Sequence, residues 1–168
     1  MKTAILYDSA TGNTAYLAQA LQQEYPDAAF CTPQDCDVAQ AERVFVGFWT
    51  DKGTCSQRLQ AVLPKLAGKE VFLFGTAGFG TSQAYFAQII ERVSANLPDS
   101  CRVIGWYMCA GRMGEAVRKR YEAMCQVPET REKGQMLLHN FELAATHPDT
   151  QDIAALLEQV RTLTSEKD

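Results

Sequence analysis

Ser9-Ala10-Thr11-Gly12-Asn13-Thr14 is the stretch of sequence on which the fold assignment rests. It follows an apolar segment, residues 2–8, and precedes a segment in which Leu17, Ala20 and Leu21 recur at helical spacing. The six residues are therefore expected to form the turn between a strand and a helix. In α/β proteins such a turn can bind anions, because backbone N–H groups converge there and the helix dipole favours negative charge.

The side chains of this stretch narrow the kind of anion. It contains four hydroxyl or amide side chains, one glycine and no lysine or arginine. A loop that holds a nucleoside triphosphate carries a lysine after its last glycine, which reaches the outer phosphates. This loop is therefore expected to hold a single phosphate with neutral donors. The alternative is that it forms only a turn and a helix cap, because Ser, Thr, Asn and Gly are common in both.

The rest of the chain alternates between short apolar segments and segments of helical periodicity. Thr54-Cys55-Ser56-Gln57 has the form of a capping box and is expected to open the second helix, which Gly68 ends. The loop after the fourth strand, residues 76–81, has its glycines in an order that does not match a dinucleotide fingerprint. Such alternation calls for right-handed crossovers and a parallel sheet. Strands are expected at residues 2–8, 28–31, 43–49, 70–75 and 101–109, and further helices at 14–25, 86–97 and 151–164.

One segment exceeds what a doubly wound fold needs. Residues 111–148 stand where a short turn would suffice, and they have helical periodicity. Because this insertion starts at the carboxyl end of a strand, it is expected near the ligand crevice. The alternative is that its apolar side chains provide only extra packing. These side chains are Met113, Val117, Tyr121 and Met124 on one face and Met136, Leu137, Phe141 and Ala144 on another.

Length and composition indicate one domain, residues 1–168. The net charge of −4 argues against general nucleic-acid affinity. The sequence shows neither a signal-like start nor an apolar run of 18 residues, so a cytoplasmic location without membrane contact is expected. The six cysteines are irregularly spaced and are expected to be reduced thiols, and His139 and His147 lack acidic partners at ligand spacing. No metal site is therefore expected.

Thr11-Gly12-Asn13-Thr14 resembles the phosphate loop of the flavodoxins, which grips the 5′-phosphate of FMN. Segments 46–54, 71–78 and 109–113 are similar to a branch of short flavodoxin-like proteins that includes the partner of the gut bacterial bilirubin reductase. The resemblance implies an α/β, flavodoxin-like, doubly wound five-stranded parallel sheet in the order 2-1-3-4-5, with a helical insertion before the last helix. It places FMN at the switch point between the first and third strands.

The resemblance also implies which residues contact FMN. Trp49 is expected to cover one face of the flavin ring, and Phe79 or Tyr85 the other. The phosphate would be held by side-chain donors of Ser9, Thr11, Asn13 and Thr14 and by the backbone of Ala10 and Gly12. The ring would be flanked by Trp49, Thr50, Asp51, Lys52 and Gly53 of one loop and by Thr76, Ala77, Gly78, Phe79, Gly80 and Tyr85 of another.

The ring loop differs from the usual pattern of the family. A glycine peptide normally flips beside the flavin N5, but here the glycine comes late, at Gly53, and Lys52 adds positive charge. The chain is nevertheless expected to be an electron carrier without catalytic residues. It would deliver electrons to a partner reductase, and the resemblance suggests a bilirubin reductase.

Two alternatives remain open. An NAD(P)H-dependent flavin reductase would need a second nucleotide site, which the sequence does not show. A receiver-like signalling domain without flavin shares the fold, and Asp8, Asp51, Thr76 and Arg112 fall loosely at its strand ends. Receivers, however, need two acids after the first strand and a lysine after the fifth, whereas this chain has one acid and an arginine.

A basic cluster in the insertion is the predicted docking site for the redox partner. Positive charge near the redox edge would steer association with an acidic patch. The alternative is a solvated helix face balanced by Glu115, Glu122 and Glu129. The cluster consists of Arg112, Arg118, Lys119 and Arg120.

Overall fold

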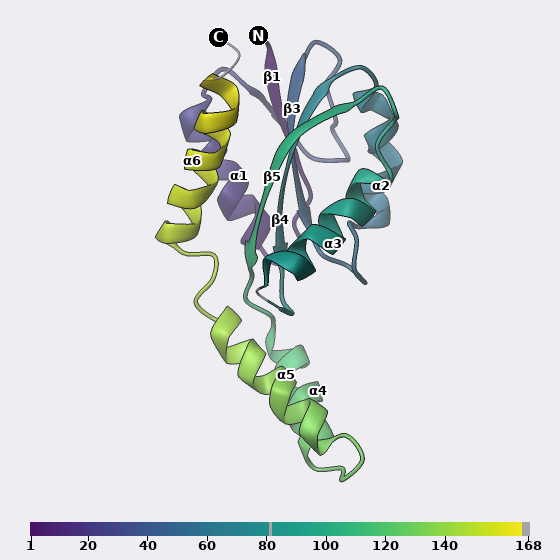
Figure 1. The fold of residues 1–168 in the computed structure, drawn as a ribbon, viewed down its shortest axis with the longest axis vertical. Coiled ribbons are helices and arrows are strands. Elements are labelled where there is room, and N and C mark those ends of the chain that lie inside the picture. The colour runs from purple at the N-terminus through teal and green to yellow at the C-terminus, as the bar shows by residue number, and fades with distance from the viewer. Residues whose placement is uncertain (81, 166–168) are drawn as a thin grey trace.

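The computed structural model describes residues 1–80 and 82–165, with a five-stranded parallel sheet at its centre (Figure 1). The strand order is β2-β1-β3-β4-β5, which confirms the predicted order 2-1-3-4-5. β3 pairs with β1 on one side and β4 on the other, so the order reverses between β1 and β3. The strands are β1 (Thr3–Tyr7), β2 (Ala29–Cys31), β3 (Arg43–Trp49), β4 (Glu70–Ala77) and β5 (Arg102–Ala110).

Helices cover both faces of the sheet (Figure 1). Side chains alternate along each strand, so Phe45 and Phe72 pack on the side of α1 and α6, whereas Val46 and Leu73 pack on the side of α2 and α3. Every residue of β4 is buried, as expected for a parallel strand covered on both sides. The helices are α1 (Asn13–Glu24), α2 (Gln57–Val62), the 3-10 helix η1 (Leu63–Leu66), α3 (Gln83–Ser94) and α6 (Thr150–Ser165).

Two local predictions were wrong. Ser56, not Thr54, caps α2: the Ser56 Oγ accepts a hydrogen bond from Leu59 N at 3.2 Å. Thr54 is held outside the helix, because it pairs with Asp51 in a tight turn. The fourth strand also extends two residues beyond the prediction, to Ala77, so Thr76 and Ala77 are strand residues. Thr81, the end of the predicted loop, lies outside the described residues.

The insertion forms two helices, α4 (Glu115–Cys125) and α5 (Arg131–Ala144). They pack against each other as a hairpin that projects from the end of the sheet opposite the two termini (Figure 1). Met136 was predicted to face inward but is 54% exposed, because it lies about 100° around the helix from its inward neighbour. The small core of this hairpin consists of Tyr121, Leu137 and Phe141, with Met113, Val117, Met124 and Leu138 partly buried against it.

Two further observations concern the whole described chain. The six cysteines are free thiols, and Cys31, Cys55 and Cys109 lie in the core. Burial raises the pKa of the Cys31 thiol to about 11, so it stays protonated at neutral pH. Among residues 1–80 and 82–165, no helix has both the length and the hydrophobicity needed to cross a membrane.

Candidate functional site

The loop between β1 and α1 presents the first turn of a helix. Gly12 is the N-cap residue and has φ 95°, which glycine adopts at little cost and other residues do not. Space does not require glycine here, since a Cβ would meet nothing within 4 Å. The Ser9 Oγ accepts hydrogen bonds from Gly12 N at 3.1 Å and Ala15 N at 3.2 Å. The N–H groups of Asn13 and Thr14 belong to the same first turn, where a helix has no internal acceptor to offer them.

The predicted phosphate-binding side chains take different positions. Thr11 is exposed and lines a cavity described below. The Asn13 Nδ2 donates to the carbonyl of Arg112 at 2.9 Å and so connects the loop to the start of the insertion. Thr14 is fully buried: its hydroxyl lies 3.0 Å from the Phe48 carbonyl, to which it donates, and 3.1 Å from the Thr76 hydroxyl. The prediction that the Thr14 side chain faces the phosphate therefore does not fit this geometry.

A cavity of about 500 Å³ lies at the carboxyl ends of the strands. Its volume is in the range of small-molecule sites. The lining brings together predicted flavin contacts from three loops, while Ser9, Gly12, Thr14, Asp51 and Gly80 are not part of it. The predicted residues that line it are Ala10, Thr11, Asn13, Trp49, Thr50, Lys52, Gly53, Thr76, Ala77, Gly78, Phe79 and Tyr85.

The insertion supplies the rest of the lining, as its place after β5 led us to expect. The sequence did not show which insertion residues line the cavity, because their helical spacing was equally consistent with extra packing. Two arginines that were predicted to dock a partner also line the cavity. The insertion residues of the lining are Gly111, Arg112, Met113, Gly114, Val117, Arg120 and Tyr121.

Trp49 is anchored by a buried carboxylate that the sequence did not reveal. The indole Nε1 donates to the Asp8 Oδ2 at 2.9 Å, which fixes one edge of the ring at the cavity. Asp8 is only 3% exposed, and it also accepts hydrogen bonds from the Ser56 hydroxyl and the Arg58 guanidinium. A carboxylate this deeply buried needs several such donors. Asp8 is therefore an anchor for Trp49, and Arg58 compensates its charge.

The conformation of the turn after β3 explains why the glycine of this loop is at position 53. Asp51 N donates to Thr54 O at 2.7 Å, and Thr54 N donates back to Asp51 O at 3.2 Å. The two central residues both have positive φ, 51° at Lys52 and 85° at Gly53, as in a type I′ turn. A Cβ at Gly53 would also lie 2.7 Å from the Arg92 guanidinium. The conformation therefore favours glycine at the second central position, whereas the Arg92 guanidinium ends a flexible side chain and could move aside.

The same segment is attached to β4 and contributes charge. Both the backbone N–H and the hydroxyl of Thr50 donate to the Thr76 carbonyl, at 3.0 and 2.8 Å. The charged side chains of the cavity lining are Lys52, Arg112 and Arg120, and no aspartate or glutamate is among the lining residues that the structure describes. In a protein of net charge −4, this cavity is locally positive.

The loop between β4 and α3 and the first turn of α3 each bring one aromatic ring to the cavity. Phe79 and Tyr85 lie edge to face, with ring centroids 5.8 Å apart and planes at 87°. Phe79 is 41% exposed, and Tyr85 is half-buried. Burial raises the pKa of the Tyr85 hydroxyl, which therefore stays neutral at physiological pH. These are the two rings predicted to cover the second face of the flavin, and both belong to the cavity wall.

The basic cluster of the insertion is not one surface. Arg112 folds back: its backbone N–H donates to the His147 carbonyl at 2.9 Å, and its guanidinium lies 3.4 Å from the carbonyls of His147 and Pro148. Arg118 pairs with Glu122 at 3.1 Å and lies over the Phe141 ring. Arg112 is exposed but directed at these carbonyls, and the half-buried Arg118 is already paired, so both are less available for docking than the sequence predicts. Lys119 is exposed, and the exposed Arg120 borders the cavity.

His147 has acidic partners, contrary to the expectation from spacing. Its Nδ1 lies 2.7 Å from the Asp152 Oδ2 and 3.9 Å from the Asp149 Oδ2. The two aspartates form a capping box at the start of α6, in which each backbone N–H donates to the other carboxylate at 2.9 Å. Tyr107 also donates to Asp152 at 3.2 Å. These contacts explain the grouping of His147, Asp149 and Asp152 as part of the cap at the start of α6.

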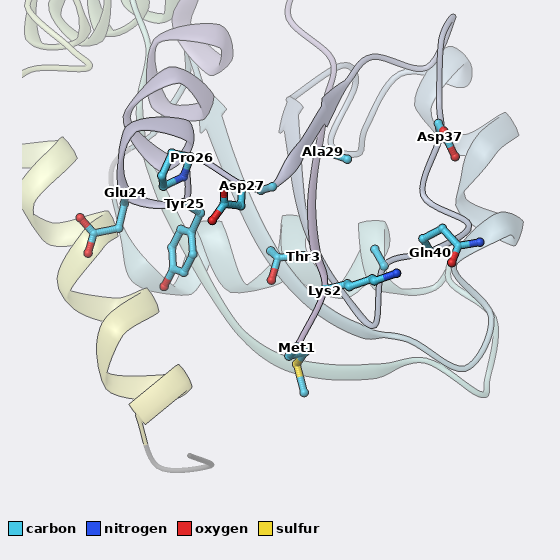
Figure 2. Close-up of a pocket in the computed structure, with 12 residues that line it drawn as sticks. Met1, Lys2, Thr3, Glu24, Tyr25, Pro26, Asp27, Ala29, Asp37 and Gln40 are labelled. Carbon is cyan, nitrogen blue, oxygen red and sulfur yellow. The ribbon is translucent and has the colours of Figure 1, made fainter.

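A larger hollow, of about 620 Å³, lies at the opposite end of the sheet (Figure 2). It is lined by residues at the amino ends of β1 and β2, including Lys2, Glu24 and Asp27. Ligands of doubly wound sheets bind outside the carboxyl ends of the strands, so we assign the site to the smaller cavity. Glu24 is in addition already paired with Arg161, at 2.6 and 2.8 Å.

Residues 4–161 match the flavodoxin domain, so the chain belongs to the flavodoxin family. It is 35% identical over 175 residues to the flavodoxin-like domain-containing protein BilS of Clostridium symbiosum (strain WAL-14163), with 92% of both chains covered. It is 31% identical over 159 residues to the protein of the same name from Clostridioides difficile (strain CD3), with 91% of this chain and 90% of that chain covered.

A solved structure supports the fold. The chain is similar to a flavoprotein in complex with FMN from Lactobacillus acidophilus NCFM, with a TM-score of 0.53. The match covers 64% of this chain and 93% of that chain. Since the two sequences are 16% identical, the likeness concerns the fold alone.

Proposed function

We propose that this protein binds FMN in the cavity at the carboxyl ends of β1, β3 and β4 and carries electrons to a partner reductase. The observation that carries this proposal is that a helix N-terminus and an aromatic-lined cavity lie side by side in one site. The first turn of α1, opened by Gly12 at positive φ, lies beside a cavity that is lined by the anchored indole of Trp49. The first feature suits a phosphate, and the second suits a planar aromatic ring.

The residues present fit FMN in chemistry as well as in place. Neutral donors and a helix N-terminus suit a single phosphate ester, while aromatic side chains from two loops suit the flavin. FMN supplies the electron-transfer chemistry when it is bound. The protein binds the phosphate, orients the ring with Trp49 and the aromatic pair Phe79 and Tyr85, and limits access of water. Lys52, Arg112 and Arg120 place positive charge at the cavity, which favours a ligand with negative charge.

A partner reductase is the proposed destination of the electrons. Among the lining residues that the structure describes, we assign none to turnover of a substrate, and both flavodoxin-like relatives carry the name BilS. Together with the resemblance seen in the sequence, this makes a bilirubin reductase the candidate partner. Lys119, exposed on the helix that borders the cavity, would contribute to docking.

Flavin titration tests the proposal. The purified protein should bind FMN at about one per chain and should bind it more tightly than riboflavin, since riboflavin lacks the phosphate. Reduced protein should pass electrons to the reductase, while NAD(P)H alone should not reduce the bound flavin at a useful rate. A protein that takes up neither flavin contradicts the proposal. Rapid reduction by NAD(P)H would instead support a flavin reductase.

The burial and the hydrogen bonds of Asp8 argue against a receiver-like signalling domain. The acids after the first strand of a receiver form an open acidic pocket, whereas Asp8 is buried and bound by Trp49, Ser56 and Arg58. Incubation with a small phosphodonor such as acetyl phosphate is therefore expected to leave the protein unmodified.

A further inference from the structure

One side chain of the insertion holds the loop between β4 and α3. The Asn140 Nδ2 donates to the Gly78 carbonyl at 2.8 Å, and the Asn140 Oδ1 accepts from the Gly80 N–H at 3.2 Å. Asn140 belongs to α5, 62 and 60 residues further along the chain. Its amide offers a donor and an acceptor on one planar group, so it can bind two backbone groups of the same loop.

Close packing on both sides leaves Gly78 and Gly80 little space for a side chain. A Cβ at Gly78 would lie 2.6 Å from the Met113 Cγ, so the insertion contacts the loop backbone directly. Gly80 has φ 80°, and a Cβ there would lie 2.7 Å from the Tyr85 ring. The insertion therefore touches the loop through Met113 and Asn140, whereas α3 touches it through Tyr85. The position of the insertion and the shape of the loop depend on each other.

The segment held in this way carries part of the cavity wall. Phe79 lies between the two glycines that Asn140 binds, and it lines the cavity together with Gly78. Its ring is 41% exposed, and its one aromatic contact within the described residues is the edge-to-face pair with Tyr85. The backbone hydrogen bonds to Asn140 thus contribute directly to where the Phe79 ring lies.

We propose that Asn140 is a positioning residue for the ring side of the flavin site. It holds Gly78 and Gly80, and through them Phe79, in the conformation that forms this wall. The inference rests on the proposed function. Because Asn140 acts on the ring side, its loss should weaken FMN and riboflavin by the same factor. Two hydrogen bonds of ordinary net strength, partly offset by water, correspond to about a tenfold change.

Asn140→Ala and Asn140→Asp test this proposal, with His139→Ala as the matched control. Asn140→Asp keeps an acceptor for the Gly80 N–H but has no donor for the Gly78 carbonyl. His139 is the exposed neighbour on the same helix. Affinities for FMN and riboflavin are measured by fluorescence titration, and the flavin absorption and emission spectra are recorded at saturating FMN. The spectra report the surroundings of the ring, which a purely structural role of Asn140 would leave unchanged.

The expected result is a loss of about tenfold for both flavins in Asn140→Ala, a smaller loss in Asn140→Asp, altered flavin spectra in both, and wild-type behaviour in His139→Ala. Wild-type affinities and spectra in the Asn140 variants would overturn the inference, as would a loss confined to FMN. If Asn140→Ala does not fold, Asn140→Asp decides. Failure of the wild-type protein to bind either flavin would instead refute the proposed function.

Discussion

The two sides of the candidate flavin site are built in different ways. The phosphate side consists of one short segment, in which Ser9, Gly12 and the first turn of α1 are neighbours in sequence. The ring side is assembled from the turn after β3, the loop after β4 and the insertion, and its contacts join residues that are 41 to 62 positions apart. A local motif can be recognised in the sequence, whereas an assembled wall depends on the packing of the whole domain.

The largest effect is expected on the phosphate side. Gly12→Val places a β-branched residue at φ 95°, where strain of about 1–3 kcal/mol is expected and the loop must rearrange. Loss of the loop conformation should weaken FMN by up to about 100-fold, as measured by fluorescence titration. Riboflavin should lose little affinity, because it has no phosphate.

Gly68→Val is the matched control for this experiment. Gly68 has φ 77° and, like Gly12, open space around the position of a Cβ, but it is not part of the cavity lining. It should lower the thermal stability by a similar amount without changing the preference for FMN over riboflavin. Equal loss for both flavins in Gly12→Val would mean that the loop has only a structural role, and the contrast between the two sides would disappear.

Substitutions on the ring side should weaken flavin binding less than Gly12→Val does. They should lower the affinities for FMN and riboflavin by the same factor. Trp49→Ala removes an aromatic wall and should loosen both flavins by about 1–2 kcal/mol, or about 5- to 30-fold, with increased flavin fluorescence. Trp49→Phe keeps an aromatic ring but loses the hydrogen bond to Asp8, and its affinity should lie between those of Trp49→Ala and the wild type. Trp106 in β5, which is not among the residues of the cavity lining, is the control for tryptophan quenching. Unchanged affinity in Trp49→Ala would assign this residue to packing.

Features formed by neighbouring residues could be predicted from the sequence, whereas contacts between distant residues could not. The parallel sheet and the turn at Thr11–Thr14 could be predicted from local signals, whereas the strand order came from the resemblance to the flavodoxins. The hydrogen bonds of Asp8 to Trp49 and of Asn140 to the loop between β4 and α3 were missed. A single Asp or Asn shows no pattern in the sequence that would identify its partner. Arg112 was predicted to face a partner, but the carbonyls of His147 and Pro148 bring it back onto the protein.

The insertion shows most clearly why such contacts escape prediction. Its helical spacing correctly indicated two apolar faces, and Tyr121, Leu137 and Phe141 do form a small core. The same spacing could not show that Met113, Val117 and Tyr121 also border the cavity, because a helix of this kind has similar sequence requirements whether it covers a core or a ligand. In the structure Met113, Val117 and Tyr121 contribute both to the core of the hairpin and to the wall of the cavity.

The smallest effect is expected outside the cavity, at the proposed docking surface. Arg118 is unsuitable for a charge reversal, because Arg118→Glu would place a negative charge beside Glu122 and remove the contact with Phe141. Lys119→Glu is the cleaner change, since Lys119 is exposed and lies one position from Arg120 at the cavity rim. The control is Lys133→Glu, because Lys133 is also an exposed lysine but lies on α5.

If Lys119 faces an acidic patch of the reductase, its reversal changes the interaction by two charges. At about 10 Å in water this corresponds to about 0.8 kcal/mol, or a fourfold slower electron transfer to the partner at low salt. At physiological ionic strength, where the Debye length is about 8 Å, the difference should fall below about twofold. FMN and riboflavin affinities should be unchanged in both variants, since neither lysine lines the cavity. Stopped-flow transfer rates at two salt concentrations check this, and equal rates for Lys119→Glu and wild type at low salt would place the docking surface elsewhere.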